Sequence, residues 1–106
     1  MKEAQIQTLH PERGKKNKSI PTEKYKIMKA AILDVLHHSE PTHTKLVQKL
    51  TENLKYKFTE NISWYAMTVK LDLEAKHIIE RTKSKPQKYR IKKQAVKVGL
   101  ISILTE

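Results

Sequence analysis

The sequence predicts a small α+β domain in which three helices are followed by a β-hairpin. Between residues 22 and 77, three segments place apolar residues at the spacing of an amphipathic helix, and after Lys76 the pattern changes to the alternation of short strands. The 106 residues, 38% of them hydrophobic, suit one domain with a modest core. We expect this domain at 20–93, between a basic, irregular N-terminal arm (1–19) and an apolar C-terminal tail (94–106).

The first helix is expected in "TEKYKIMKAAILDVLHH", residues 22–38. Pro21 suits its first turn, where the missing N–H is not needed, and Pro41 disfavours helix at the residue before it. The apolar stripe at helical spacing consists of Tyr25, Met28, Ile32, Val35 and Leu36.

The second helix is expected in "TKLVQKLTENL", residues 44–54. Thr42 or Thr44 can supply the oxygen that caps its first turn. Its apolar positions follow helical spacing and comprise Leu46, Val47, Leu50 and Leu54.

The third helix, in "NISWYAMTVKLDLEAKH" (residues 61–77), is apolar on two faces, and Asn61 or Thr59 can cap it. One face is an ordinary core stripe of Ile62, Ala66, Val69 and Leu73. The opposite side, where a surface helix is polar, carries Trp64, Leu71 and Ala75, with Met67 near its edge.

Three partners are possible for this second face: a terminal segment, a second copy of the chain, or a nucleic-acid groove. The tail "AVKVGLISIL" (95–104) or the N-terminal "IQTL" are the candidate segments. Because monomers rarely expose large apolar patches, we expect cover by protein and assign Trp64, Met67 and Leu71 to an interaction or dimer face.

Beyond the third helix, "IIER" (78–81) and "KYRI" (88–91) have the composition of short strands. The polar turn "TKSKPQ" (82–87), which contains Pro86, separates them. The sequence therefore predicts a C-terminal β-hairpin.

Charge is the strongest global feature, because 22 Lys and Arg outnumber 11 Asp and Glu and leave a net charge of +11. The segment "RGKKNK" (13–18) holds four cations and no acid, and residues 81–105 hold eight cations and no acid. Runs of one sign favour a polyanionic partner, although solvation alone is the other explanation.

Several other classes of function are disfavoured, and we expect no enzyme, catalytic residue, cofactor, metal or small-molecule ligand. The chain has no Cys, only two Gly, and five scattered His, so Cys-based sites and a Gly-rich phosphate loop are excluded. Its apolar runs are far shorter than a membrane span, and its first residues lack a secretory signal. We therefore expect a cytoplasmic protein with no membrane partner.

The segment "LEAKHIIER" (73–81), followed by a basic turn and "KYRI", resembles the junction of helix 3 and wing in winged-helix (winged helix-turn-helix) proteins. The longer block "ISWY…TVKLDLEA…IER…P…YRI" is similar to a family of small, uncharacterised bacterial winged-helix proteins, and the resemblance covers about residues 20–91. It implies a three-helix core with a C-terminal β-hairpin wing, and a role with nucleic acid. Winged-helix chains usually carry Gly where His77 stands, so we expect a positive φ at His77.

The resulting expectation is a regulator-like protein that binds nucleic acid, most simply duplex DNA, through phosphate contacts. The alternative is a winged helix that serves as a protein-interaction or dimerisation module without a nucleic-acid role. The residues assigned to nucleic acid are Arg81, Lys83, Lys85, Lys88 and Arg90 in the wing, Lys15 and Lys16 in the arm, and Ser63 and Lys70 on the third helix.

Overall fold

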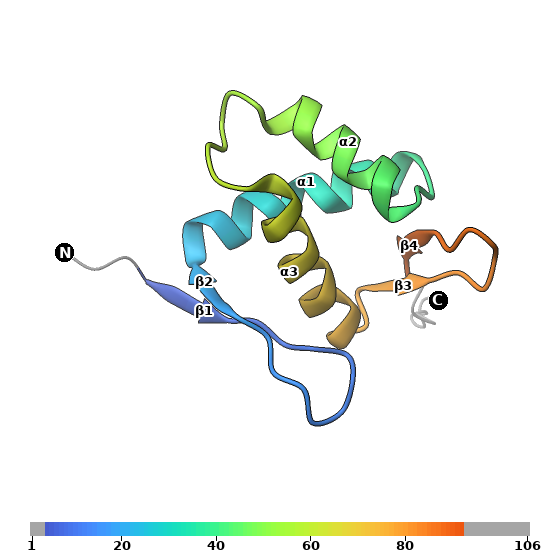
Figure 1. Cartoon of the computed structure of the whole chain (residues 1–106), viewed down its shortest axis with the longest axis horizontal. Coiled ribbons are helices and arrows are strands. Elements are labelled where there is room, and N and C mark those ends of the chain that lie inside the picture. Colours follow the sequence, from blue (N-terminus) through green and yellow to red (C-terminus); the bar gives the residue numbers. More distant parts are fainter. Residues whose placement is uncertain (1–3, 93–106) are drawn as a thin grey trace, which may run out of the picture.

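The computed structural model describes residues 4–92, which form an α+β domain of three helices and two small antiparallel hairpins (Figure 1). In chain order the elements are β1 (Gln5–Gln7), β2 (Ser19–Pro21), α1 (Thr22–His38), α2 (His43–Leu54), α3 (Ile62–Ala75), β3 (Ile79–Arg81) and β4 (Tyr89–Ile91). The predicted order of three helices and a hairpin is confirmed. No helix in this part of the chain is long and apolar enough to cross a membrane.

Local capping signals set the start of α2 and α3. The Thr42 hydroxyl accepts the Lys45 N–H at 3.3 Å, and the Asn61 side chain accepts the Trp64 N–H at 2.9 Å. Each of these bonds satisfies one of the first-turn N–H groups that have no partner within the helix. Of the alternatives that the sequence left open, Thr42 and Asn61 are therefore the caps.

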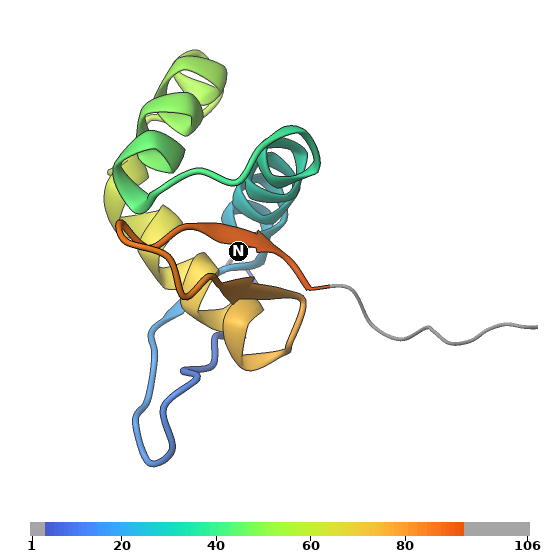
Figure 2. The same ribbon diagram turned by 90° about the vertical axis from the view of Figure 1, so that its right-hand side faces the viewer.

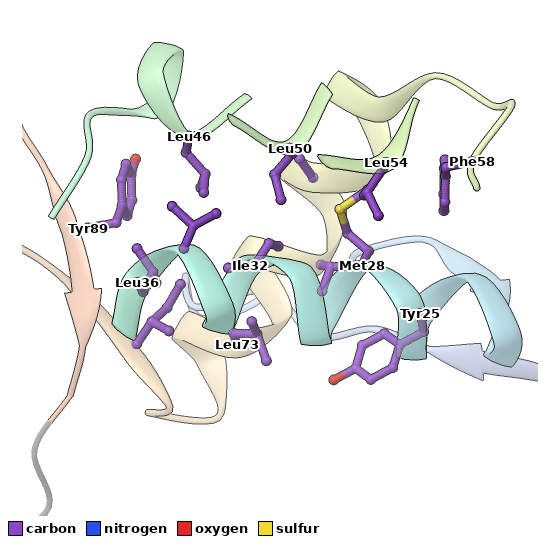
Figure 3. Packing of buried hydrophobic residues seen from close by; sticks show 14 of the residues in the cluster. Tyr25, Met28, Ile32, Leu36, Leu46, Leu50, Leu54, Phe58, Leu73 and Tyr89 are labelled. Atoms are coloured by element: carbon purple, nitrogen blue, oxygen red, sulfur yellow. The ribbon is translucent and has the colours of Figure 1, made fainter. Parts of the chain in front are cut away.

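The hydrophobic core lies where α1 crosses α2 and α3, and the close view in Figure 3 shows side chains from all three helices converging there. Met28 and Ile32 of α1 are fully buried, as are Leu46 and Leu50 of α2. From α3 the core takes Ala66, Val69 and Leu73, as the periodicity of the sequence predicted. One face of α3 is thus committed to the core.

The β3–β4 hairpin is attached to the helices through the connection between α1 and α2. Tyr89 donates its backbone N–H to the Pro41 carbonyl at 2.9 Å, and Thr42 forms a bridge with Lys88. At the base of the hairpin loop, Thr82 exchanges backbone and side-chain hydrogen bonds with Lys88. These bonds hold the basic loop, residues 82–88, against the helical domain.

The N-terminal segment differs from the irregular arm that the sequence predicted. β1 pairs antiparallel with β2, with Ile6 opposite the buried Ile20. The loop between them, residues 8–18, packs on α3, where the Leu9 N–H reaches Asp72 at 2.8 Å and the Asn17 amide reaches the Thr68 carbonyl at 2.9 Å. Strands of three residues carry almost no periodic signal, so the sequence pattern did not predict this hairpin.

A fully buried carboxylate, Asp72, joins this N-terminal hairpin to two helices. Its oxygens accept the Leu9 N–H, the Tyr25 hydroxyl from α1, and the Lys76 ammonium at 3.0 Å. Burial and the bond to Asp72 raise the pKa of Tyr25. Burial alone would lower the pKa of Lys76, but hydrogen bonds with Asp72 and Tyr25 raise it. The cluster therefore keeps Tyr25 neutral and Lys76 charged.

The end of α3 confirms the expectation for His77, which has a φ of 60°. The His77 N–H bonds the Glu74 carbonyl at 3.0 Å, and the Ile78 N–H bonds the Leu73 carbonyl at 2.9 Å. This pair of bonds is a Schellman motif, which turns the chain out of the helix and into β3. The predicted tail, residues 94–106, lies outside the described residues.

A comparison of two substitutions at position 77 tests the positive φ. Both His77→Gly and His77→Ala remove the imidazole, but only Ala retains a Cβ that is strained in this conformation. We expect the Gly variant to be more stable than the Ala variant by about 1 kcal/mol, measured by denaturant melts. An Ala variant as stable as the Gly variant would contradict the Schellman geometry.

The Asp72 cluster makes a second prediction about stability. Asp72→Ala leaves the Leu9 N–H and the Tyr25 hydroxyl without an acceptor and removes the counter-charge of Lys76. We expect it to lower the free energy of unfolding by about 2–4 kcal/mol, somewhat less than for a fully buried ion pair because Lys76 is partly exposed. The control, Glu12→Ala, breaks an exposed ion pair with Lys15 and should cost no more than about 0.5 kcal/mol. Equal losses in the two variants would show that Asp72 does not have this role.

Candidate nucleic-acid interface

The exposed residues on the side of α3 that faces away from the core are uncharged, and Glu74 on the same side is paired with Arg81. We define the outer face of α3 as Ser63, Trp64, Met67 and Leu71. Trp64 is 42% exposed and Met67 is 48% exposed, whereas Leu71 is half-buried. The Trp64 ring packs edge-on against the Tyr65 ring, with the ring centroids 5.0 Å apart.

The sequence led us to expect a protein segment over this face, and residues 4–92 do not supply one. The N-terminal loop does pack on α3, but on the neighbouring flank, at Thr68 and Asp72. Trp64 and Met67 remain exposed beside it. Cover by the tail, residues 94–106, lies outside the described residues, and a second copy stays a prediction.

Two hairpins border the outer face of α3, one on each side (Figures 1 and 2). The β1–β2 hairpin lies on the side of Thr68 and Asp72, through the contacts of Leu9 and Asn17. The β3–β4 hairpin lies on the other side, through the contact of Arg81 with Glu74. Figure 1 shows both hairpin loops extending beyond the helices. Residues 13–18 and the described part of the second basic segment, residues 81–92, therefore lie on either side of one helix.

The three lysines predicted in the β3–β4 loop are all exposed: Lys83, Lys85 and Lys88. None of them forms an ion pair with another residue in the range 4–92. The hydrogen bonds of Thr82 hold the loop that carries these lysines. The three side chains therefore present three uncompensated positive charges to solvent.

The two arginines of this hairpin have partners of their own. Arg81 forms an ion pair with Glu74, whose side chain is only 8% exposed, and Arg90 forms one with Glu80 at 2.7 Å. The hydrogen bond with Glu74 raises the pKa of Arg81. The ion pair with Arg81 compensates the negative charge of Glu74. Arg81 and Arg90 therefore carry less free charge than their number in the sequence suggests.

In the N-terminal loop, Lys15 and Lys16 are both exposed. Lys15 forms an ion pair with Glu12 at 3.1 Å, an exposed pair that contributes little to stability. Both lysines line an open cleft between this loop and Ala75 at the end of α3. The structure therefore brings these predicted residues close to α3.

Lys70 is the one predicted contact residue that the structure places elsewhere. Its side chain is only 3% exposed, and its ammonium lies 3.1 Å from Nδ1 of His43 and 3.9 Å from the centre of the Tyr89 ring. A buried lysine needs such partners, because an unpaired charge in the interior is costly. The assignment of Lys70 to the nucleic-acid contact is therefore wrong, and the residue instead joins α2, α3 and β4.

His43, the first residue of α2, provides the acceptor for the Lys70 ammonium and is neutral when it does so. Burial lowers the pKa of His43, and the nearby charges of Lys70 and Arg81 lower it further. Protonation of His43 would place two cations in contact and remove the acceptor. The junction of α2, α3 and β4 therefore depends on a neutral imidazole.

Sequence reasoning missed two residues that position this surface, Asp72 and Asn17. The Asn17 amide donates to the Leu9 and Thr68 carbonyls, both at 2.9 Å, and so holds the loop on α3. An acidic residue four positions before Lys76, on a helix with two apolar faces, was the available signal for Asp72. Nothing local distinguishes Asn17 from the other polar residues around it.

In residues 4–92, no three His, Cys, Asp or Glu residues are grouped so that they could hold a metal ion.

The environment of His43 predicts a loss of stability in acid. Because the folded-state pKa lies below the ordinary value near 6.5, the unfolded chain binds the proton more readily. The stability that neutral His43 contributes to the folded state is fully present above pH 6.5, and it is lost as the pH falls through the folded-state pKa. Urea melts across this range should show a weaker pH dependence for His43→Gln and for Lys70→Met than for the wild type. An unchanged dependence in His43→Gln would contradict the assignment.

Comparison with known proteins identifies a family and nothing beyond it. No curated protein and no solved structure matches the chain. The sequence pattern of a family of unknown function, DUF6958, matches residues 5–89, from β1 to the first residue of β4. Because this match spans well over half of the 106 residues, the chain belongs to the family of unknown function DUF6958.

Proposed function

We propose that this protein binds duplex DNA through phosphate contacts made by its two basic hairpin loops, in a regulator-like role. The observation that supports the proposal best is the position of exposed lysines on both sides of α3. Lys83, Lys85 and Lys88 lie on one side, and the loop that holds Lys15 and Lys16 lies on the other. A helix bordered by two cationic loops matches the form of a duplex, in which a groove is bordered by two phosphate backbones.

We further propose that the domain is a winged helix, in which β3–β4 is the wing and α2–α3 the helix-turn-helix. Three features support this: the order of the elements, the Schellman turn from α3 into β3, and the bridge from the α1–α2 connection to β4. In such a domain the helix that follows the turn enters the major groove. The outer face of α3 is the surface available for that contact.

The charge pattern agrees with a polyanionic partner. Both acidic residues of α3 are paired within the fold, Asp72 with Lys76 and Glu74 with Arg81. The outer face therefore presents no free carboxylate to a phosphate, while the net charge of the chain is +11. Contacts of this kind give affinity and orientation but little sequence selectivity.

A protein partner on α3 is the second candidate function, and the exposure of Trp64 and Met67 favours it. Apolar side chains in contact with each other on a surface commonly mark an interface. An acidic partner would also explain the net positive charge. The dependence of binding on salt and on the hairpin lysines separates the two functions.

Binding to a duplex of random sequence should weaken steeply as salt is added. Phosphate contacts from five to seven Lys or Arg predict that the logarithm of the association constant K falls with the logarithm of the salt concentration, at a slope of roughly −4 to −6. Replacing Lys83, Lys85 and Lys88 together by Ala should make the slope less steep by about 2 to 3. Fluorescence anisotropy of a labelled duplex, titrated at several salt concentrations, measures both quantities.

The matched control replaces Lys26, Lys49 and Lys57 by Ala. These exposed lysines lie beside α1 residues, away from the outer face of α3, and each triple variant lowers the net charge from +11 to +8. The control should keep nearly the whole slope. Equal effects of the two triple variants would show that only net charge matters, and a failure to bind any duplex at low salt would refute the proposed function.

A further inference from the structure

The outer face of α3 has an unusual chemistry for a surface between two cationic loops. Its members offer one hydroxyl from Ser63, one indole N–H from Trp64, and otherwise the apolar surface of Met67 and Leu71. It carries no charge and no amide. A surface of this kind cannot form the bidentate hydrogen bonds by which Arg, Asn or Gln recognise guanine and adenine.

We propose that the outer face of α3 recognises the 5-methyl groups of thymine in the major groove of duplex DNA. This inference rests on the proposed function and adds the feature of DNA that α3 contacts. Thymine is the one base that presents an apolar group in the major groove, and apolar side chains are its usual partners. The other base edges present mainly donors and acceptors, which Met67 and Leu71 would desolvate without replacement.

The dimensions of the fold permit this contact. A helix of 14 residues is about 21 Å long and, with its side chains, about 10–12 Å wide, which matches a major groove about 12 Å across. Met67 is the most exposed apolar residue of the outer face, and Trp64 lies one turn before it on the same side. With α3 in the groove, the loops on either side lie toward the two phosphate backbones.

Charge favours DNA over a second copy of the chain as the occupant of this face. Two copies joined through α3 would bring their hairpin loops together, and these loops hold free lysines on both sides of the helix. Like charges brought together at the rim of an interface oppose association. A DNA duplex instead pairs the same lysines with phosphates.

The test compares two duplexes of the same A·T-rich sequence, one with thymine and one with deoxyuridine throughout. Deoxyuridine lacks the 5-methyl group and retains the charge and the hydrogen-bonding groups of thymine. Burying one methyl group changes affinity about fourfold, so contact with one or two methyl groups predicts about 4-fold to 16-fold weaker binding to the deoxyuridine duplex. The affinity of the full-length chain for both is measured at one fixed salt concentration.

Two variants show whether α3 is responsible for the difference. Met67→Ala shortens the most exposed apolar side chain of the outer face, and it should reduce the preference for thymine to less than about twofold. Its salt slope should stay within the range of the wild type, because the lysines are untouched. Tyr56→Ala removes an aromatic ring that is 90% exposed in the turn after α2, and this control should keep the full preference.

Trp64 is the only Trp of the chain, so its fluorescence reports directly on the outer face. In the free protein, acrylamide should quench it readily, and addition of the thymine duplex should protect it. Equal affinity for the two duplexes, or a preference that survives in Met67→Ala, overturns the inference but leaves the proposed function standing. If Trp64 is protected from acrylamide without DNA and becomes exposed on dilution, a second copy of the chain covers this face. That result also overturns the inference. No duplex binding at all refutes both proposals.

Discussion

The carboxylate of Asp72 is the interaction on which the arrangement of this surface depends. It is fully buried, and it accepts hydrogen bonds from the Leu9 backbone, the Tyr25 hydroxyl and the Lys76 ammonium. Through these bonds one side chain of α3 holds the N-terminal loop and α1 in position. Such a group is stable in the interior only while its acceptors are satisfied, so the loop and the two helices depend on one another. The position of the N-terminal cations follows from this cluster.

On the other side of α3, a second set of polar contacts positions the β3–β4 hairpin. Lys70 is enclosed between His43 and Tyr89, and Glu74 is paired with Arg81. The charged residues of α3 thus bind partners within the domain, on the two flanks of the helix. What remains exposed is a neutral, apolar ridge with free lysines beyond it on both sides. This division of charge supports the proposed binding to a DNA groove more strongly than the number of lysines alone does.

Sequence patterns predicted the helices and the C-terminal hairpin well because the responsible forces are local. The 3.6-residue repeat of apolar positions gave the stripes of α1, α2 and α3, and a single polar side chain before each of α2 and α3 supplied its cap. The positive φ that ends α3 was implied by the resemblance to winged-helix chains, which usually carry Gly at the position of His77. The winged-helix interpretation itself rests on resemblance and remains a proposal.

By itself, the sequence determined the helices, the candidates for their caps, the core stripe and the two basic segments, since each depends on residues a few positions apart. The tertiary structure alone decided that residues 5–21 form a hairpin, that Lys70 is buried, and which cations are left free. Each of these outcomes depends on contacts between residues distant in the chain, such as Leu9 with Asp72 and Lys70 with His43. The physical reason is that burial and ion pairing depend on which groups the fold brings together, and the spacing of residues along one helix does not contain that information.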